Sequence, residues 1–351
     1  MDRREFLITT SGAAVVASTA ASTVAGATEP EIAAPSVVGT RRTLELSMPW
    51  SDDGKGFGDS ARRLARRIEA LTDNRYRIEI HEAQPAGTAT DLAHGTAHDF
   101  AVHHPAFAYF AGLPGIHGLP AQDFATWLTV GGGQMLWDDL AAEVGVKPLL
   151  AGHSGAPPPL WSTAPLAGLS DLAGRKIYAP GLGVEVARAL GAEVVSIDAR
   201  NVSAGMADRS VDIAEWGGML VSMAAGIPTH ARYATGTGFS TAGTALALHV
   251  SLSVWNGLPS VDKAALEAAT LQEFHASCAE ARAHDAIARK TLISRFGVAF
   301  TSFPPDIADA VKRVADATVA HVAGRDAKSK RIDASYMAFR TAITDTESPL
   351  A

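Results

Sequence analysis

The sequence predicts an α/β fold that is divided into two lobes. Strand and helix patterns alternate from residue 42 onward, and two strand–helix units follow one another within residues 171–216. A long apolar, β-prone run at residues 244–254 then precedes a long helical pattern. With 351 residues, of which 47% are hydrophobic, the chain exceeds the ~100–200 residues of a typical domain. We therefore expect two lobes, with the run at 244–254 crossing between them and the long helix bracing both.

The N-terminus has the pattern of an export signal. Two arginines, Arg3 and Arg4, precede an apolar run rich in alanine and valine, and residues 25–27 fit a small-x-small cleavage site. We interpret residues 1–27 as a twin-arginine signal peptide and residues 28–41, which are rich in Pro, Ala and Ser, as a flexible leader. No later stretch approaches the ~20 apolar residues of a membrane span. The expected location is the periplasm, without a direct membrane anchor.

Composition excludes several classes of function. Lys and Arg number 30 against 37 for Asp and Glu, and the resulting net charge of -7 disfavours nucleic-acid binding. The lone cysteine, Cys278, cannot form an internal disulfide and lies far from the signal, so no lipid anchor is indicated. A single cysteine also excludes a cysteine-ligated iron–sulfur cluster, and the chain has no Cys-x-x-Cys-His haem motif. We therefore expect no bound cofactor.

The first lobe begins with a strand at residues 43–48, whose apolar residues alternate and which brings Trp50 to a strand tip. An amphipathic helix follows, with Ser60 or Asp59 as its N-cap and four arginines on a face that we expect to be solvated. Strands that alternate with helices favour parallel pairing. Further strands of this lobe are expected at residues 76–80, 100–102 and 148–151.

The second lobe is expected to begin near Trp161. After a helical turn closed by Gly174, strands and helices alternate again. The expected strands are residues 176–178, 193–197 and 211–213, and the expected helices are residues 184–190 and 203–207.

The C-terminal third returns between the lobes. Ser260 is expected to cap the long helix, which continues toward Leu292 and precedes a strand at 297–300. Pro304 and Pro305 then open another helix. We assign residues 42–155 and 252–300 to lobe I, 156–251 and 301–345 to lobe II, and 346–351 to a frayed tail.

Several motifs resemble, in their order and spacing, the substrate receptors of tripartite ATP-independent periplasmic (TRAP) transporters, and among these the 2-oxo-acid-binding subgroup. They are Asp171-Leu-Ala-Gly-Arg-Lys-Ile177, Leu190-Gly-Ala192 followed by Val195, Val211-Asp-Ile-Ala-Glu-Trp216, Trp255-Asn-Gly-Leu-Pro259 and Gly297-Val298. The resemblance covers nearly all of the mature chain. It implies a type II periplasmic-binding-protein-like fold, with a mixed sheet flanked by helices in each lobe. It also implies that the lobes close on one small solute, which is handed to a membrane permease.

One position departs from this family's pattern. In the family, an arginine at the end of the strand after Gly174 typically pairs with a substrate carboxylate, and here that position holds Tyr178. Arg175 points to the opposite face of such a strand, and Lys176 lies roughly 7 Å back on the same face. Loss of the arginine moves the expected solute from an organic acid toward a neutral or amine-bearing one. A simpler alternative is that Tyr178 only closes the floor of the cleft.

Glu215 and Trp216 form a second landmark, because in the 2-oxo-acid subgroup the matching pair helps to hold a metal ion. A family glutamine is missing from residues 156–159, and Thr241 replaces a family glutamate. A hard cation prefers about six oxygen ligands, and one carboxylate with one carbonyl supplies few of them. We expect no metal, and Glu215 and Trp216 as its ligands if one is bound. Glu215 could instead pair with an ammonium group beside Trp216 and Trp50, or be only a partly solvated carboxylate.

Four histidines cluster at residues 94–104. His94 and His98 are spaced i, i+4, but Gly95 interrupts that turn, and we interpret both as surface residues. His103 and His104 follow an expected strand, so one of them could reach the cleft. The predicted solute-binding residues are Tyr178, Glu215, Trp216, Thr241, His103 and Trp50.

Two other classes of function stay open. A periplasmic enzyme with a bound cofactor would suit twin-arginine export, but Val186 stands where the dinucleotide fingerprint needs its third glycine. A hydrolase is disfavoured because no Gly-x-Ser-x-Gly elbow surrounds His153 and Ser154, and no catalytic residue is predicted. The chain could also be a degenerate or sensor receptor without a transport role. A receptor of this kind is expected to be a monomer or a homodimer.

Overall fold

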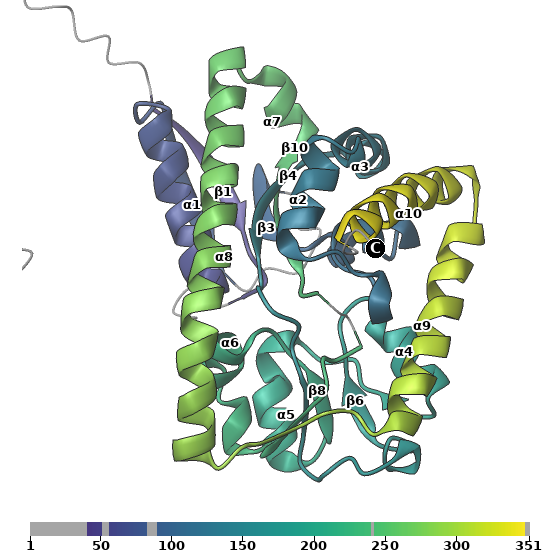
Figure 1. The fold of residues 1–351 in the computed structure, drawn as a ribbon. Helices are drawn as coiled ribbons and strands as arrows, with labels where there is room; N and C mark the ends of the chain where they lie inside the picture. Colours follow the sequence, from purple (N-terminus) through teal and green to yellow (C-terminus); the bar gives the residue numbers. More distant parts are fainter. Residues whose placement is uncertain (1–40, 51–55, 83–89, 240–241, 348–351) are drawn as a thin grey trace, which may run out of the picture. The chain divides into compact units, whose positions relative to one another are not determined.

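Two mixed β-sheets organise the chain (Figure 1). The structure is a computed structural model that describes residues 41–50, 56–82, 90–239 and 242–347. The predicted signal peptide, nearly all of the predicted leader and Thr241 lie outside the described residues. In the described part, no helix has the length and apolar character needed to cross a membrane.

The first sheet has the strand order β2-β1-β3-β10-β4. β1 runs parallel to β2 and β3, whereas β10 is antiparallel to both of its neighbours. Apolar clusters cover both faces of β10. A strand buried on both faces favours apolar residues at successive positions, and β10 is apolar except at His249 and at its last residue, Ser251. The members are β1 (Arg42–Ser47), β2 (Tyr76–His81), β3 (Leu92–Gly95), β4 (Val146–His153) and β10 (Ala245–Ser251).

The second sheet has the strand order β11-β9-β5-β8-β6-β7. β6 runs parallel to β7 and β8, and β5 is antiparallel to β8 and β9. Successive residues of β5 serve opposite faces, since Leu160 and Trp161 belong to different apolar clusters. The members are β5 (Leu160–Ser162), β6 (Lys176–Tyr178), β7 (Glu193–Val194), β8 (Ile213–Glu215), β9 (Tyr233–Thr235) and β11 (Ala299–Thr301).

Helices cover the two sheets, and we call each sheet with its helices the first and the second lobe. The first lobe contains α1 (Phe57–Leu71), α2 (Ala121–Thr129), α3 (Gly133–Ala141) and α7 (Leu252–Gly257). The second lobe contains α4 (Gly183–Ala189), α5 (Val202–Asp208) and α6 (Met219–Ala224). The last two helices are α9 (Pro305–Gly324), which contacts elements of both lobes, and α10 (Ala327–Glu347), which packs on α3 and α9.

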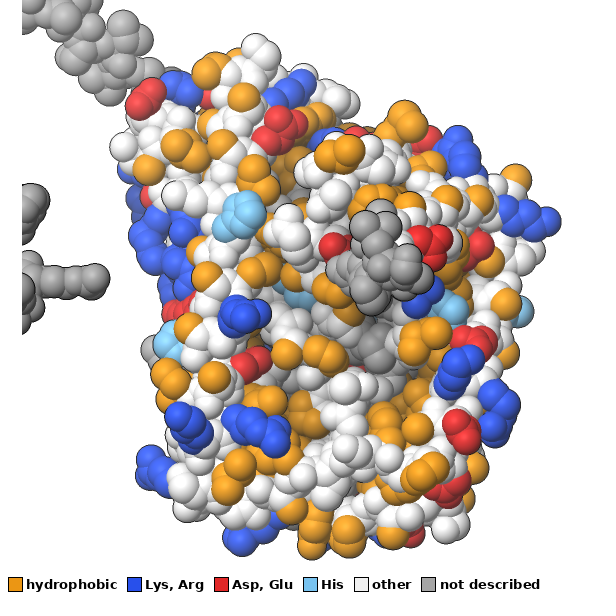
Figure 2. Space-filling view, in the orientation of Figure 1, with side chains coloured by type: hydrophobic (Ala, Val, Ile, Leu, Met, Phe, Trp, Pro, Cys, Tyr) orange, Lys and Arg blue, Asp and Glu red, His pale blue; other side chains and the backbone are white. Residues whose placement is uncertain are grey.

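The long helix α8 (Ser260–Phe296) braces both lobes, because it contacts α1 and β4 of the first and α6 of the second (Figure 1). Its Glu273 is fully buried and accepts hydrogen bonds from Ser60 Oγ and Arg63 Nη2, both at 2.8 Å, while Arg67 also pairs with it. Figure 2 shows basic side chains gathered along α1. The prediction of a purely solvated arginine face is therefore wrong for Arg63 and Arg67, which turn toward α8 to neutralise a buried carboxylate.

Some local predictions are wrong for identifiable reasons. Residues 100–102 do not form a strand. Phe100 ends a short 3-10 helix and packs into an apolar cluster of the first lobe, whereas Val102 is 88% exposed. The strand lies earlier, at β3. Neither Ser60 nor Asp59 caps α1, which begins directly after Gly56. Ser260 is likewise the first residue of α8, whose N-cap is Pro259.

The C-terminal part also differs from the prediction. The sequence analysis did not identify α10, and residues 345–347 continue this helix. β10 pairs in the first sheet, although it falls in the predicted lobe II, and β11 pairs in the second sheet. Since hydrogen bonds assign a strand to its sheet, the pairing differs from the predicted lobe boundaries at residues 245–251 and 299–300.

Candidate functional site

Three predicted site residues meet at one edge of the second sheet. Tyr178 ends β6 and Glu215 ends β8, and these two strands are parallel neighbours in which Tyr178 lies opposite Ala214. The rings of Tyr178 and Trp216 lie 6.0 Å apart at a tilt of 49°. The carboxyl ends of adjacent parallel strands are where ligands bind in open α/β sheets. The fold therefore brings Tyr178, Glu215 and Trp216 together at such an edge.

The surroundings of Tyr178 are acidic. Glu215 is fully buried, and a Cβ atom at Gly238 would lie 2.5 Å from its Oε1 atom, so the close approach requires a glycine at this position. Burial, together with the carboxylates of Asp198, Asp99 and Glu215, raises the pKa of the Tyr178 hydroxyl to about 12. The hydroxyl therefore stays protonated at neutral pH and can donate a hydrogen bond.

Aromatic side chains of the first lobe face this edge. Trp50, which follows β1, lies with its ring 5.2 Å from Phe57 and 5.2 Å from His94. The Cζ atom of Phe57 lies 3.8 Å from the position that a Cβ atom of Gly217 would take. Phe57 at the start of α1 therefore reaches the loop that carries Trp216.

His98 and Asp99 belong to the short 3-10 helix Ala97–Phe100 that follows β3. The imidazole of His98 covers Gly181 of the second lobe so closely that a Cβ atom there would overlap the ring, and Gly181 has a φ of +52°. Burial lowers the pKa of His98 to about 4. Burial also raises the pKa of Asp99 to about 6, against the effect of the Thr96 N–H that donates to it at 3.0 Å.

The prediction that His94 and His98 are surface residues is wrong. His94 is fully buried, and it lies on β3. The ring nitrogens of His98 are also buried. One pattern could have located this segment, because Thr96 and Asp99 have the spacing of a capping box, which marks a helix start at residue 96.

Several buried polar atoms around this edge have no hydrogen-bond partner among the described residues. They are the Nε1 atoms of Trp50 and Trp216 and both ring nitrogens of His94 and His98. Burying a polar group without a partner costs free energy, and most such groups in proteins are paired. Such a group of unpaired atoms between two lobes is typical of a site that receives a polar molecule. We call these residues, together with Tyr178, Glu215, Phe57 and Asp99, the interlobe site.

Two predicted site residues are not part of this arrangement as described. His103 follows the exposed Val102 and is itself exposed. Thr241 lies outside the described residues.

The donor set offers little to a metal ion. The described residues contain no group of three His, Cys, Asp or Glu side chains that could hold one. The carbonyl oxygen of Trp216 already accepts a hydrogen bond from Ser222 Oγ at 3.2 Å. Glu215 and this carbonyl are thus a poor fit for a hard cation, which prefers about six oxygen ligands.

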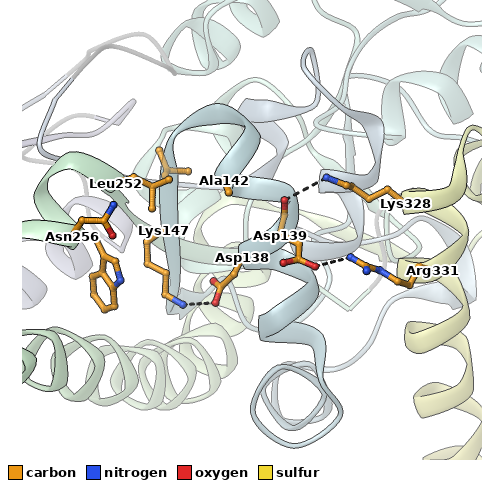
Figure 3. Close-up of a pocket in the computed structure, with 10 residues that line it drawn as sticks. Asp138, Asp139, Ala142, Lys147, Leu252, Asn256, Lys328 and Arg331 are labelled. Carbon is orange, nitrogen blue, oxygen red and sulfur yellow. Dashed lines mark hydrogen bonds and ion pairs between the residues drawn. The ribbon is translucent and has the colours of Figure 1, made fainter.

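A separate surface pocket lies in the first lobe between α3, β4, α7 and α10 (Figure 3). Its charged side chains satisfy one another: Lys147 pairs with Asp138 at 2.5 Å, Arg331 pairs with Asp139 at 2.6 Å, and Lys328 pairs with Glu143. These pairs join α10 and β4 to α3. This α3–α10 pocket therefore has the character of a packing junction, and the interlobe site is the better candidate for function.

Comparisons with known proteins find a matching family model and a similar protein. Residues 50–326 match the family model of bacterial extracellular solute-binding protein, family 7. A monocarboxylate 2-oxoacid-binding periplasmic protein of Nostoc sp. (strain PCC 7120) is 26% identical, over 98% of this chain and 95% of that protein.

Solved structures show the same fold. A TRAP transporter solute-binding protein from Bordetella bronchiseptica RB50, with calcium and picolinate, has a TM-score of 0.82 at 21% identity and covers 87% of this chain and 93% of its own. One from Chromohalobacter salexigens, with bound (S)-(+)-2-amino-1-propanol, has a TM-score of 0.76 at 16% identity and covers 88% and 98%. The predicted two-lobed α/β fold is thereby confirmed.

Proposed function

The chain belongs to family 7 of the bacterial extracellular solute-binding proteins, as a substrate-binding protein of the TRAP type, and from this premise we propose that it binds a small neutral or amine-bearing solute at the interlobe site. The relatives are receptors rather than enzymes, and the solute is then delivered to a TRAP membrane permease. The receptor reaches the periplasm through the twin-arginine route and works as a monomer or homodimer.

The convergence of Tyr178, Glu215 and Trp216 carries this proposal. A tyrosine hydroxyl offers one neutral hydrogen bond at the position where the resemblance to the family implies a guanidinium that clamps a carboxylate. The charged groups that raise the pKa of this hydroxyl are the carboxylates of Asp198, Asp99 and Glu215. Asp198 is itself paired with Arg200 at 2.7 Å, which reduces its contribution. An anionic solute would be repelled by this set, whereas an ammonium group would be attracted by it.

The aromatic residues support the same class of solute. An ammonium group is stabilised over the face of a tryptophan or tyrosine ring, and Trp50, Trp216 and Tyr178 supply three such rings. The Nε1 atoms of Trp50 and Trp216 can donate to hydroxyl or carbonyl oxygens of the same molecule. A solute that joins both lobes stabilises the closed state by its higher affinity for that state.

A thermal-shift screen tests this function. We expect small amines, amino alcohols such as 2-amino-1-propanol, or neutral hydroxylated compounds to raise the melting temperature, and pyruvate to have no effect. The matched variant Tyr178→Arg restores the cation, so it should gain stabilisation by pyruvate. Stabilisation of the unmodified protein by pyruvate, without any response to amines or neutral compounds, would show that the proposed solute class is incorrect.

A further inference from the structure

Three residues of α8, spaced by four, lie against the chain where it crosses from the first lobe to the second. They are Ser277, Ala281 and Asp285, and we call them the α8 stripe. Residues at i, i+4 and i+8 share one face of a helix, so the stripe is a continuous surface. Figure 1 shows α8 passing both sheets, and its contacts with β4 and α6 place this face at the crossing.

The first two stripe residues hold the crossing segment itself. The backbone N–H of His153 donates to Ser277 Oγ at 3.1 Å. A Cβ atom at Gly155, which has a φ of +82°, would lie 2.5 Å from Ala281 Cβ, so only glycine allows the chain to pass this close to α8. Ser154 and Thr244 then join the two crossing segments, since Ser154 N donates to Thr244 O at 2.9 Å and Thr244 N donates to Ser154 Oγ at 2.7 Å.

The third stripe residue holds the start of α6. The backbone N–H of Leu220 donates to Asp285 Oδ1 at 3.0 Å. Gly218 is the N-cap of α6 and has no side chain with which to satisfy these first N–H groups, so the carboxylate of another helix supplies the cap. A Cβ atom at Gly218 would lie 3.0 Å from Asp285 Oδ2 and 3.2 Å from the Ser154 carbonyl oxygen. The loop is thus fitted between α8 and the crossing segment.

The same loop carries Trp216 of the interlobe site and directly follows Glu215, the last residue of β8. On its other side, Ser222 Oγ donates to the Trp216 carbonyl at 3.2 Å and accepts from Trp161 Nε1 at 3.0 Å. The backbone between Trp216 and Gly218 is therefore fixed by Ser222 from within α6 and by Asp285 from α8.

We propose that Asp285 is a positioning residue for the solute site. From α8 it fixes the loop that follows Glu215 and carries Trp216, and the α8 stripe connects this loop to the crossing between the lobes. This inference rests on the proposed function, because Glu215 and Trp216 are the groups that would contact the solute. Solute affinity then depends on a side chain that acts only through the loop.

The test uses the full chain labelled with 5-fluorotryptophan, whose six fluorine resonances are assigned by single Trp→Phe variants. Asp285→Ala and Gly218→Ala are expected to shift the Trp216 resonance. Both should also speed amide hydrogen exchange at residues 219–222 by at least tenfold. Asp285→Asn keeps an oxygen that accepts from Leu220 and should retain the wild-type resonance and exchange rates.

A control variant separates positioning from general stability. Asp262 is a buried acid near the start of α8 that accepts from Arg75 at 2.5 Å and from Tyr76 Oη at 2.7 Å, within the first lobe alone. Asp262→Asn should lower the melting temperature and leave the Trp216 resonance in place. The proposal is overturned if Asp285→Ala leaves that resonance unchanged, or if Asp262→Asn moves it as far. Should Asp285→Ala fail to fold, Gly218→Ala and Asp285→Asn decide the question. Neither readout involves a solute, so a failed solute screen would leave this test intact.

Discussion

In the α3–α10 pocket every lysine and arginine of the lining faces a carboxylate, whereas at the interlobe site the buried nitrogens of Trp50, Trp216 and His98 have no partner among the described residues. Both regions contain polar side chains, and the α3–α10 pocket contains more charged ones. The pairing of the polar groups, rather than the number of charges, separates them. Paired charges hold elements together, and unpaired buried groups are costly unless another molecule pairs with them.

The sharpest way to break this comparison is to remove one carboxylate from each region. Glu215→Ala should abolish the thermal stabilisation by the solute, since a hydrogen bond to a charged group contributes about 1.5–3 kcal/mol and its loss leaves the solute's own polar group unpaired. Asp139→Ala in the α3–α10 pocket should leave that stabilisation unchanged. Melting curves of both variants, with and without the stabilising solute, measure the difference. If the solute stabilises both variants equally, the interlobe site and the α3–α10 pocket do not differ in solute binding.

The buried histidines make the stability of the protein depend on pH. Burial lowers the pKa of His94 to about 3 and that of His98, His153 and His249 to about 4, from 6.5. As the pH falls from 6.5 toward 4, the unfolded chain binds protons that the folded chain does not, so the free energy of unfolding decreases. Each pKa unit corresponds to about 1.4 kcal/mol, so several histidines together give a large effect. Urea unfolding at pH 7 and pH 5 should show markedly lower stability at pH 5.

Asp99 acts with the opposite sign. Its pKa is raised from 3.8 to about 6, so the folded protein binds a proton below pH 6 that the unfolded chain binds only near pH 3.8. The contribution of Asp99 to the free energy of unfolding therefore increases as the pH falls, and it partly offsets the loss caused by the histidines. Asp99→Asn should therefore make the loss of stability between pH 7 and pH 5 steeper. A shallower loss in this variant would mean that Asp99 is ionised in the folded protein.

A smaller effect is expected at Tyr178. Tyr178→Phe keeps the ring and removes only the hydroxyl, so solute affinity should fall by about 1 kcal/mol, or roughly fivefold, in calorimetric titration. Tyr109→Phe is the matched control, because its hydroxyl donates to Asp333 at 2.7 Å in the core of the first lobe. That variant should lower stability and leave affinity unchanged. If Tyr178→Phe binds as tightly as wild type, the hydroxyl only closes the floor of the site.

The smallest effect is expected for the surface pairs. The Arg331 side chain is 56% exposed and that of Asp139 is 50% exposed. Water and salt screen such a pair, so Arg331→Met should cost at most about 1 kcal/mol of stability and leave solute binding unchanged. A loss of binding in this variant would give the α3–α10 pocket a role in function.

The sequence was sufficient to predict the fold class and to place Tyr178, Glu215 and Trp216 at one edge of a sheet. Tyr178 and Glu215 end apolar strands that are recognisable from their alternation, and parallel strands place their carboxyl ends together. The first lobe's half was not predicted in the same way. Leu92–Gly95 is a strand of four residues that includes a histidine and a glycine, and its burial depends on β10, which is more than 140 residues away in sequence. Local patterns cannot report such a pairing, so His94 and His98 were predicted to lie on the surface.

The contacts of α8 were also outside the reach of the sequence. Its 3-4 apolar rhythm predicted a long bracing helix, which is confirmed. Asp285 caps α6, and Arg63 and Arg67 neutralise Glu273. Both contacts depend on how α8 lies against α6 and α1, which are distant from these residues in sequence. Buried acids on a long helix look in sequence like residues of its solvated face.

Native mass spectrometry of the protein with its stabilising solute tests the central claim most directly, because it counts bound molecules for each variant. We expect one solute per chain in the wild type and in Arg331→Met, and none in Glu215→Ala. Retention of the solute by Glu215→Ala together with its loss from Arg331→Met would place binding in the α3–α10 pocket and contradict the account.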